Sequence, residues 1–96
     1  MKVPPAIVFS LAREFLGLTQ QDVEVHSRIS RSSIQRIEQG RHRLLDTVIR
    51  LQEFYEGRGI VFLQPVDGRG WGLVNNNLIT LEVQLDKHPS ADGRNS

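Results

Sequence analysis

The apolar residues in the first 57 positions recur every three or four residues, the spacing that gathers side chains on one face of an α-helix. Prolines, glycines and small polar residues divide this part of the chain into segments of helical length. We therefore expect four helices, at about residues 5–17, 19–27, 31–39 and 46–57. In the first, the apolar residues at helical spacing are Ile7, Leu11, Phe15 and Leu18, flanked by Val8, Ala12 and Leu16.

Capping side chains locate the starts of the later helices. Thr19 and Asp22 have the spacing of a capping box, with Asp in place of the usual Glu. Ser30 and Asp46 are expected to be the N-caps of the third and fourth helices, because both side chains can accept a hydrogen bond from a first-turn N–H. Glycines follow the first, third and fourth helices and are expected to end them: Gly17, Gly40, Gly57 and Gly59.

Beyond residue 59 the pattern changes to that of β-strands. Residues 60–63 and 71–74 are short runs of strand length on either side of a turn-rich segment, and residues 79–85 alternate strictly between apolar and polar. Residues 88–96 have the composition of a flexible tail. We expect a mainly α fold with a small antiparallel β-segment, divided into a helical domain (1–58), a β extension (59–87) and the tail (88–96).

Composition narrows the class of protein. The chain has 96 residues, of which 39% are hydrophobic and 24% charged, as expected for one globular domain. The absence of cysteine excludes disulfides, cysteine-bound zinc and a cysteine nucleophile. No apolar run approaches the roughly 20 residues that span a bilayer, and no signal peptide is evident, so we expect a cytoplasmic protein. The three histidines have no metal-ligand spacing and no nucleotide or hydrolase motif is present, so neither a cofactor nor an enzyme is expected.

The net charge is only +1, but basic residues cluster between positions 28 and 43. Five arginines lie there against a single acid, Glu38. Such a local excess is typical of a docking surface for phosphates, although a solvated charged face is an alternative.

The third helix concentrates this chemistry on one face. At about 100° per residue, Ile34 and Ile37 face the core, while hydrogen-bonding side chains without acids face outward. Arg can pair with guanine and Gln with adenine in the major groove, and Ser adapts to either base. A polar helix face that meets only water is the alternative interpretation. The outward residues are Arg31, Ser32, Gln35, Arg36 and Gln39.

The order Leu18-Thr19-Gln20, Val23, Ile29-Ser30 and then Ser-x-x-x-Ile-x-x-Ile-Glu-x-Gly over residues 30–40 resembles the lambda-repressor/Cro-like (XRE) helix-turn-helix family. The resemblance covers about residues 6–57 and implies four to five helices, with the third in the major groove of double-stranded DNA. It implies a fold-organising role for Glu38, through a salt link or a cap. It implies base reading by Arg31, Ser32, Gln35 and Arg36, and phosphate contacts by Gln20, Arg28, Gln39, Arg41 and Arg43.

Two positions differ from that family's pattern. Glu24 stands where the family usually has Ala, and Arg28 stands where it usually has Gly, at a turn that often needs a positive φ. A non-Gly residue in that conformation costs about 1–2 kcal/mol. We therefore expect a turn of different construction, in which Glu24 pairs with Arg28.

The tract over residues 59–72 resembles an extension found in many short bacterial regulators of the same family. We expect it to form a two-fold dimer, because two recognition helices one DNA turn apart read more base pairs than one helix. An intrachain sheet is the alternative, with Trp71 filling the core. The expected interface residues are Ile60, Phe62, Trp71, Leu81 and Val83.

Together these patterns predict a DNA-binding transcriptional regulator that represses from a palindromic operator as a homodimer. The alternative is a protein-interaction module, resembling an antitoxin or an anti-activator. In that case the same scaffold, or the strand at 79–85, would hold a protein partner.

Overall fold

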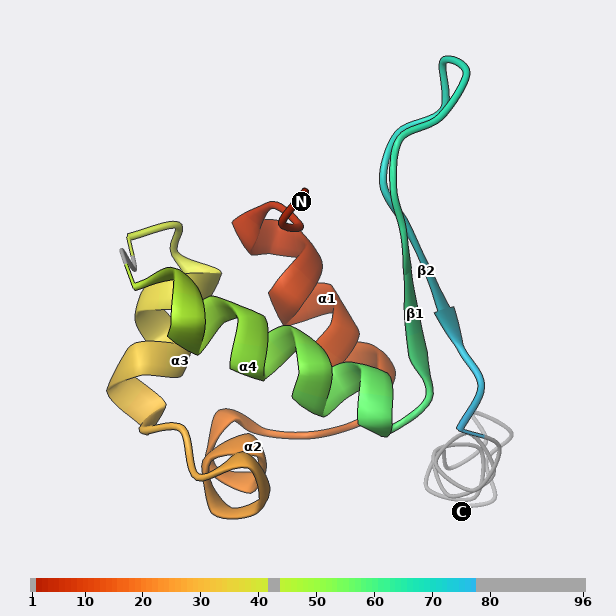
Figure 1. Cartoon of the computed structure of the whole chain (residues 1–96). Helices are drawn as coiled ribbons and strands as arrows, with labels where there is room; N and C mark the ends of the chain where they lie inside the picture. Colours follow the sequence, from red (N-terminus) through yellow and green to blue (C-terminus); the bar gives the residue numbers. More distant parts are fainter. Residues whose placement is uncertain (1, 42–43, 78–96) are drawn as a thin grey trace, which may run out of the picture.

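The computed structural model describes residues 2–41 and 44–77, and in them four helices are followed by one β-hairpin (Figure 1). The elements are α1 (Ala6–Phe15), α2 (Gln20–Ser27), α3 (Arg31–Glu38), α4 (Leu45–Gly57), β1 (Ile60–Leu63) and β2 (Gly72–Asn75). The predicted fold class, mainly helical with a β extension, is confirmed. The predicted strand at 79–85, the tail and residues Arg43, Leu81 and Val83 lie outside the described residues.

The capping side chains act largely as predicted. Thr19 and Asp22 form a complete capping box: Asp22 N–H donates to Thr19 Oγ1 over 3.0 Å, and Thr19 N–H donates to Asp22 Oδ2 over 2.9 Å. Ser30 Oγ accepts from Ser33 N–H at the start of α3. The prediction for Asp46 is wrong, because the N-cap is Leu44, two residues earlier, and α4 begins at Leu45. Asp46 lies within the first turn, where its negative charge interacts favourably with the helix dipole.

Two glycines end helices as predicted. Gly17 and Gly40 have φ values of 72° and 74°, a left-handed conformation that glycine adopts without a steric penalty. After α1, the N–H groups of Gly17 and Leu18 bond back to the carbonyls of Glu14 and Arg13. After α3, Gly40 and Arg41 repeat the same pair of bonds. Both ends are therefore Schellman motifs that turn the chain sharply out of the helix.

One core joins all four helices to the first strand. Its buried residues are Phe9, Ala12, Leu16, Val23, Ile29, Ile34, Ile37, Val48, Leu51, Tyr55 and Ile60. From α1 the core takes Ala12, which flanks the predicted apolar row, and Phe9, which the prediction did not include, while Ile7, Leu11 and Phe15 in that row are exposed. The helix thus has two apolar faces, of which the intrachain core uses one.

The hairpin packs beside α1 and α4 through its inner face. β1 and β2 pair antiparallel, with Ile60 opposite Asn75 and Phe62 opposite Leu73. The rings of Phe62 and Phe9 lie 5.9 Å apart, and the Asn75 side-chain amide donates to the carbonyl of Phe15 over 2.8 Å. These two strands therefore pair within the chain and are attached to the C-terminal end of α1.

The hairpin continues past its regular strands as an arm. Pairing resumes at Val66 and Arg69, whose backbone groups exchange two hydrogen bonds of 3.1 and 2.9 Å. Asp67 and Gly68 form the turn between them, both with positive φ, which is the preferred geometry for a two-residue hairpin loop. Figure 1 shows this arm rising past the N-terminal end of α1 and away from the helices.

Candidate nucleic-acid interface

The turn between α2 and α3 adopts the left-handed conformation despite its bulky residue. Arg28 has φ 64° and ψ 21°, so the expectation of a differently built turn is wrong. Ile29, directly after it, is buried in the core, and its N–H donates to Ser27 Oγ over 3.0 Å. Burial of Ile29 and this local hydrogen bond hold Arg28 in a conformation that costs about 1–2 kcal/mol.

Glu24 does not form the predicted pair with Arg28. Its Oε2 instead accepts a hydrogen bond of 3.0 Å from the backbone N–H of Arg31, the first residue of α3. A carboxylate at this place accepts a hydrogen bond from a first-turn N–H that has no partner within the helix, and its negative charge interacts favourably with the positive end of the helix dipole. Glu24 therefore links α2 to the start of α3, a role that the sequence comparison with the family pattern did not suggest.

The outward face of α3 is arranged as predicted. Ile34 and Ile37 are buried, while the predicted base-reading residues and Gln39 are exposed. Within the described part of the chain, the side chains of Gln35 and Arg36 have no hydrogen-bond or ion-pair partner. The hydroxyl of Ser32 lies 3.3 Å from that of Ser30. The buried isoleucines fix the helix, so its polar face is presented in a single orientation.

The predicted phosphate-binding residues border this face at both ends. Arg28 is exposed at the turn before α3. After α3, Arg41 Nη2 donates to Gln39 Oε1 over 2.7 Å, so these two side chains lie together beyond the last turn. Gln20, Arg31 and Gln35 line a cavity of about 500 Å³ between the start of α2 and the face of α3.

The interface rests on a buried polar network around Glu38, as the resemblance implied. Arg13 Nε lies 2.8 Å from Glu38 Oε2, and Arg13 Nη2 lies 3.0 Å from Oε1. The amide of Gln20 also donates to Oε1 over 3.0 Å, and Arg13 Nη1 donates to the carbonyl of Leu18. This hydrogen bonding with Glu38 raises the pKa of Arg13, although burial acts in the opposite direction. Glu38 thereby joins α1, α2 and α3 at one carboxylate.

Tyr55 of α4 lies in the core close to this network. Burial raises the pKa of its phenol well above the usual value, and the charge of Glu38 raises it further. Within the described residues its hydroxyl has no hydrogen-bond partner. Neither Tyr55 nor Arg13 is among the predicted site residues. The sequence signal for Arg13 is its position directly after Ala12, beside the apolar side of the first helix, where a charged residue needs a partner.

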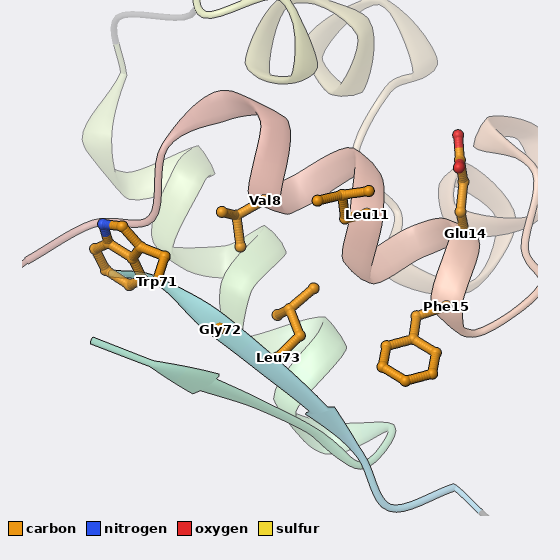
Figure 2. A pocket seen from close by; sticks show the side chains of 7 residues that line it. All are labelled: Val8, Leu11, Glu14, Phe15, Trp71, Gly72 and Leu73. Atoms are coloured by element: carbon orange, nitrogen blue, oxygen red, sulfur yellow. The ribbon is translucent and has the colours of Figure 1, made fainter. Parts of the chain in front are cut away.

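The residues expected at a dimer interface face different ways. Ile60 is buried in the core of its own chain, and Phe62 packs on Phe9. Trp71 is half-buried beside α1, next to Val8 (Figure 2).

The comparison with protein families agrees with the geometry. A family model described as a helix-turn-helix domain matches residues 8–57, which run from α1 to the end of α4. The chain belongs to the helix-turn-helix family. No curated protein and no solved structure gave a match. In helix-turn-helix proteins, the second helix of the motif is the one that lies in the major groove of DNA. In this chain the second helix of the motif is α3.

Two further features, a metal-ligand cluster and a membrane-spanning helix, are absent from the described residues. None of their His, Asp and Glu side chains gather in threes or more at a spacing that could hold a metal ion. None of the helices in residues 2–41 and 44–77 is long and apolar enough to cross a membrane.

Proposed function

We propose that this helix-turn-helix protein is a transcriptional regulator that reads a specific double-stranded DNA operator with α3 in the major groove. The observation that carries the proposal is the outward face of α3. Arg31, Ser32, Gln35 and Arg36 are exposed there without an acid among them, on a helix held by two buried isoleucines. Bidentate donors and acceptors of this kind match the edges of guanine and adenine.

Phosphate contacts hold the helix in register on the duplex. Gln20 and Arg28 precede α3, while Gln39, Arg41 and Arg43 follow its core-facing isoleucines. Contacts from both ends of the helix fix its position along the groove but carry no base information. We assign these five residues to the DNA backbone.

The active form in this proposal is a homodimer on a palindromic operator, with the β extension as the dimerisation element. One helix reads only a few base pairs, and two helices about 34 Å apart multiply the specificity. Repression is the simplest mode of action for so small a protein, because a bound dimer occludes a promoter without any further domain.

Selection of bound sequences from a random DNA pool tests this function. The expected result is a palindrome whose half-sites are about 10 base pairs apart, centre to centre. Selection of a single non-palindromic motif would support specific DNA binding but overturn the homodimer. No enrichment of any sequence would overturn base reading by α3.

A protein-interaction module is the second candidate, favoured by the apolar outer face of the hairpin. Val61, Leu63 and Val74 are exposed there. Salt dependence separates the two functions. DNA affinity falls steeply with salt, because the release of counterions on binding is less favourable at high salt, whereas the affinity of an apolar protein contact changes little.

A further inference from the structure

Exposed apolar side chains are concentrated on one side of the molecule. Ten large apolar side chains of the described residues are exposed. Seven of the ten belong to α1 or to the hairpin and its arm, a concentration that is typical of an interaction surface, whereas scattered single residues are not. These seven are Ile7, Leu11, Phe15, Val61, Leu63, Val66 and Val74.

A groove lies between α1 and β2, on the inner side of the hairpin, and two of the seven, Leu11 and Phe15, line it (Figure 2). Its volume is about 480 Å³, and its walls include Leu11, Phe15, Trp71 and Leu73. Among the described residues, the one charged side chain on its wall is Glu14, which is largely exposed and has its Oε2 3.9 Å from Arg13 Nη2. The groove is thus apolar along its length, with a weakly paired carboxylate on its wall.

The arm of the hairpin has the features that complement this groove. Every residue from 66 to 70 is exposed, and the tip carries the apolar Val66 and the basic Arg69. Beyond Leu63 the arm extends four residues to its turn, or about 13 Å at 3.3 Å per residue. The exposed row on α1 from Ile7 to Phe15 covers eight residue-to-residue steps, or about 12 Å at 1.5 Å per step. The arm is therefore as long as the apolar row of α1.

We propose that the groove of one copy takes the arm of a second copy, so that two chains exchange arms across a two-fold axis. Val66 of each arm packs against Leu11 and Phe15 of the other chain, and Arg69 pairs with Glu14. A two-fold axis makes every contact occur twice, which doubles the effect of a small contact surface. This inference rests on the homodimer of the proposed function and names the surfaces that form it.

The position of the arm is compatible with DNA binding. In Figure 1, α3 and the hairpin lie on opposite sides of the helical body. A dimer joined through the arms leaves the outward faces of both α3 helices accessible, so dimerisation and base reading do not compete.

Sedimentation velocity of the full chain at several micromolar concentrations, without DNA, tests the inference. We expect a reversible dimer. Leu11→Glu should weaken it by about 10- to 100-fold, the range expected for a charge introduced at the centre of an interface. The matched control is Val25→Glu, at an apolar residue of α2 that is also exposed, which should leave the dimer unchanged.

Charge reversal tests the ion pair at positions that tolerate substitution. Glu14→Arg and Arg69→Glu should each weaken the dimer by about two- to fivefold, and the double variant should restore it. Trp71 is the only tryptophan, so its quenching by acrylamide reports directly on the groove. Quenching should decrease as the dimer forms.

Several results would overturn the exchange of arms. A monomeric wild-type chain with a quenchable Trp71 would leave the groove open to a small apolar ligand. A monomer in which Trp71 is shielded from acrylamide would mean that another segment of the same chain covers the groove. A dimer that resists Leu11→Glu and shows no rescue in the charge-reversed pair would use a different surface. Binding of one DNA half-site is measured separately, so each of these failures is distinct from a failure of α3 to read DNA.

Discussion

Arg13 and Glu38 are 25 positions apart in the sequence and meet in a two-pronged ion pair, with nitrogen–oxygen distances of 2.8 and 3.0 Å. Side-chain exposure is 15% for Arg13 and 8% for Glu38, so solvent screens the pair only weakly. Because Gln20 shares the same carboxylate, the pair also sets where α2 begins relative to α3. The orientation of α3 thus depends on one carboxylate that is not part of its outward polar face.

Glu38→Ala should destabilise the fold by about 3 kcal/mol, because it leaves the guanidinium of Arg13 in a largely buried site without its partner. Urea unfolding followed by circular dichroism measures the change. The double variant Arg13→Met with Glu38→Leu should recover most of the loss, since an apolar pair of similar volume carries no desolvation cost. If Glu38→Ala and the double variant were equally stable, the unpaired charge of Arg13 would not be the cause of the destabilisation.

Arg28→Gly should raise stability and lower DNA affinity at the same time. Relief of the left-handed conformation contributes about 1–2 kcal/mol, and the greater chain entropy of glycine offsets about 0.5–1 kcal/mol of it. The lost charge should reduce the slope of log affinity against log salt by about 1. Arg28→Ala is the matched control: it loses the same charge but keeps the backbone strain. A gain in stability from Arg28→Ala would contradict the strain argument.

Local signals in the sequence predicted the helical part of the fold well. The capping box at Thr19 and the N-cap at Ser30 each depend on residues within three positions, so single-chain spacing was enough to place them. The outward face of α3 was predictable for the same reason, because helical periodicity alone separates Ile34 and Ile37 from the polar residues. The prediction of Asp46 as a cap failed because the helix begins two residues earlier than such a cap requires, with Leu45 and Asp46 in its first turn.

Contacts between distant segments were not predictable. Which apolar face of α1 enters the core depends on where α4 and the hairpin pack, and periodicity fits both Ile7 and Val8. The bond from Glu24 to the N–H of Arg31 crosses the turn, and it exists only because Arg28 adopts the left-handed conformation. From residue type alone, Arg28 was expected to avoid the left-handed conformation, because that conformation is rare for residues other than glycine.

Tyr55 should make stability depend on alkaline pH. Its pKa is raised in the folded protein, so between about pH 10 and 12 the unfolded chain loses the phenolic proton while the folded chain keeps it. The contribution of Tyr55 to the free energy of unfolding should be complete below about pH 10 and then fall by about 1.4 kcal/mol per pH unit. Urea unfolding across this range measures the slope.

Tyr55→Phe is the control for this slope. Within the described residues the hydroxyl has no hydrogen-bond partner, so its removal should cost little stability near neutral pH. The alkaline decline should become much smaller in the variant, and Tyr55 is the only tyrosine of the chain, so its absorbance titration is unambiguous. An unchanged decline would assign the effect to other groups.

Arg36→Ala and Arg41→Ala should affect DNA binding in different ways, because Arg36 lies on the outward face of α3 and Arg41 lies after its end. Loss of a bidentate contact to a base should cost about 1–3 kcal/mol on the selected operator and relax the preference at one base pair. Loss of a phosphate contact should weaken all sequences alike and reduce the salt slope by about 1. The two effects are separated by measuring the affinity of both variants at several salt concentrations. The DNAs to compare are the operator, single-base variants of it and unrelated DNA. Equal, sequence-independent losses would mean that Arg36 contacts the backbone, and base reading would then fall to Arg31, Ser32 and Gln35 alone.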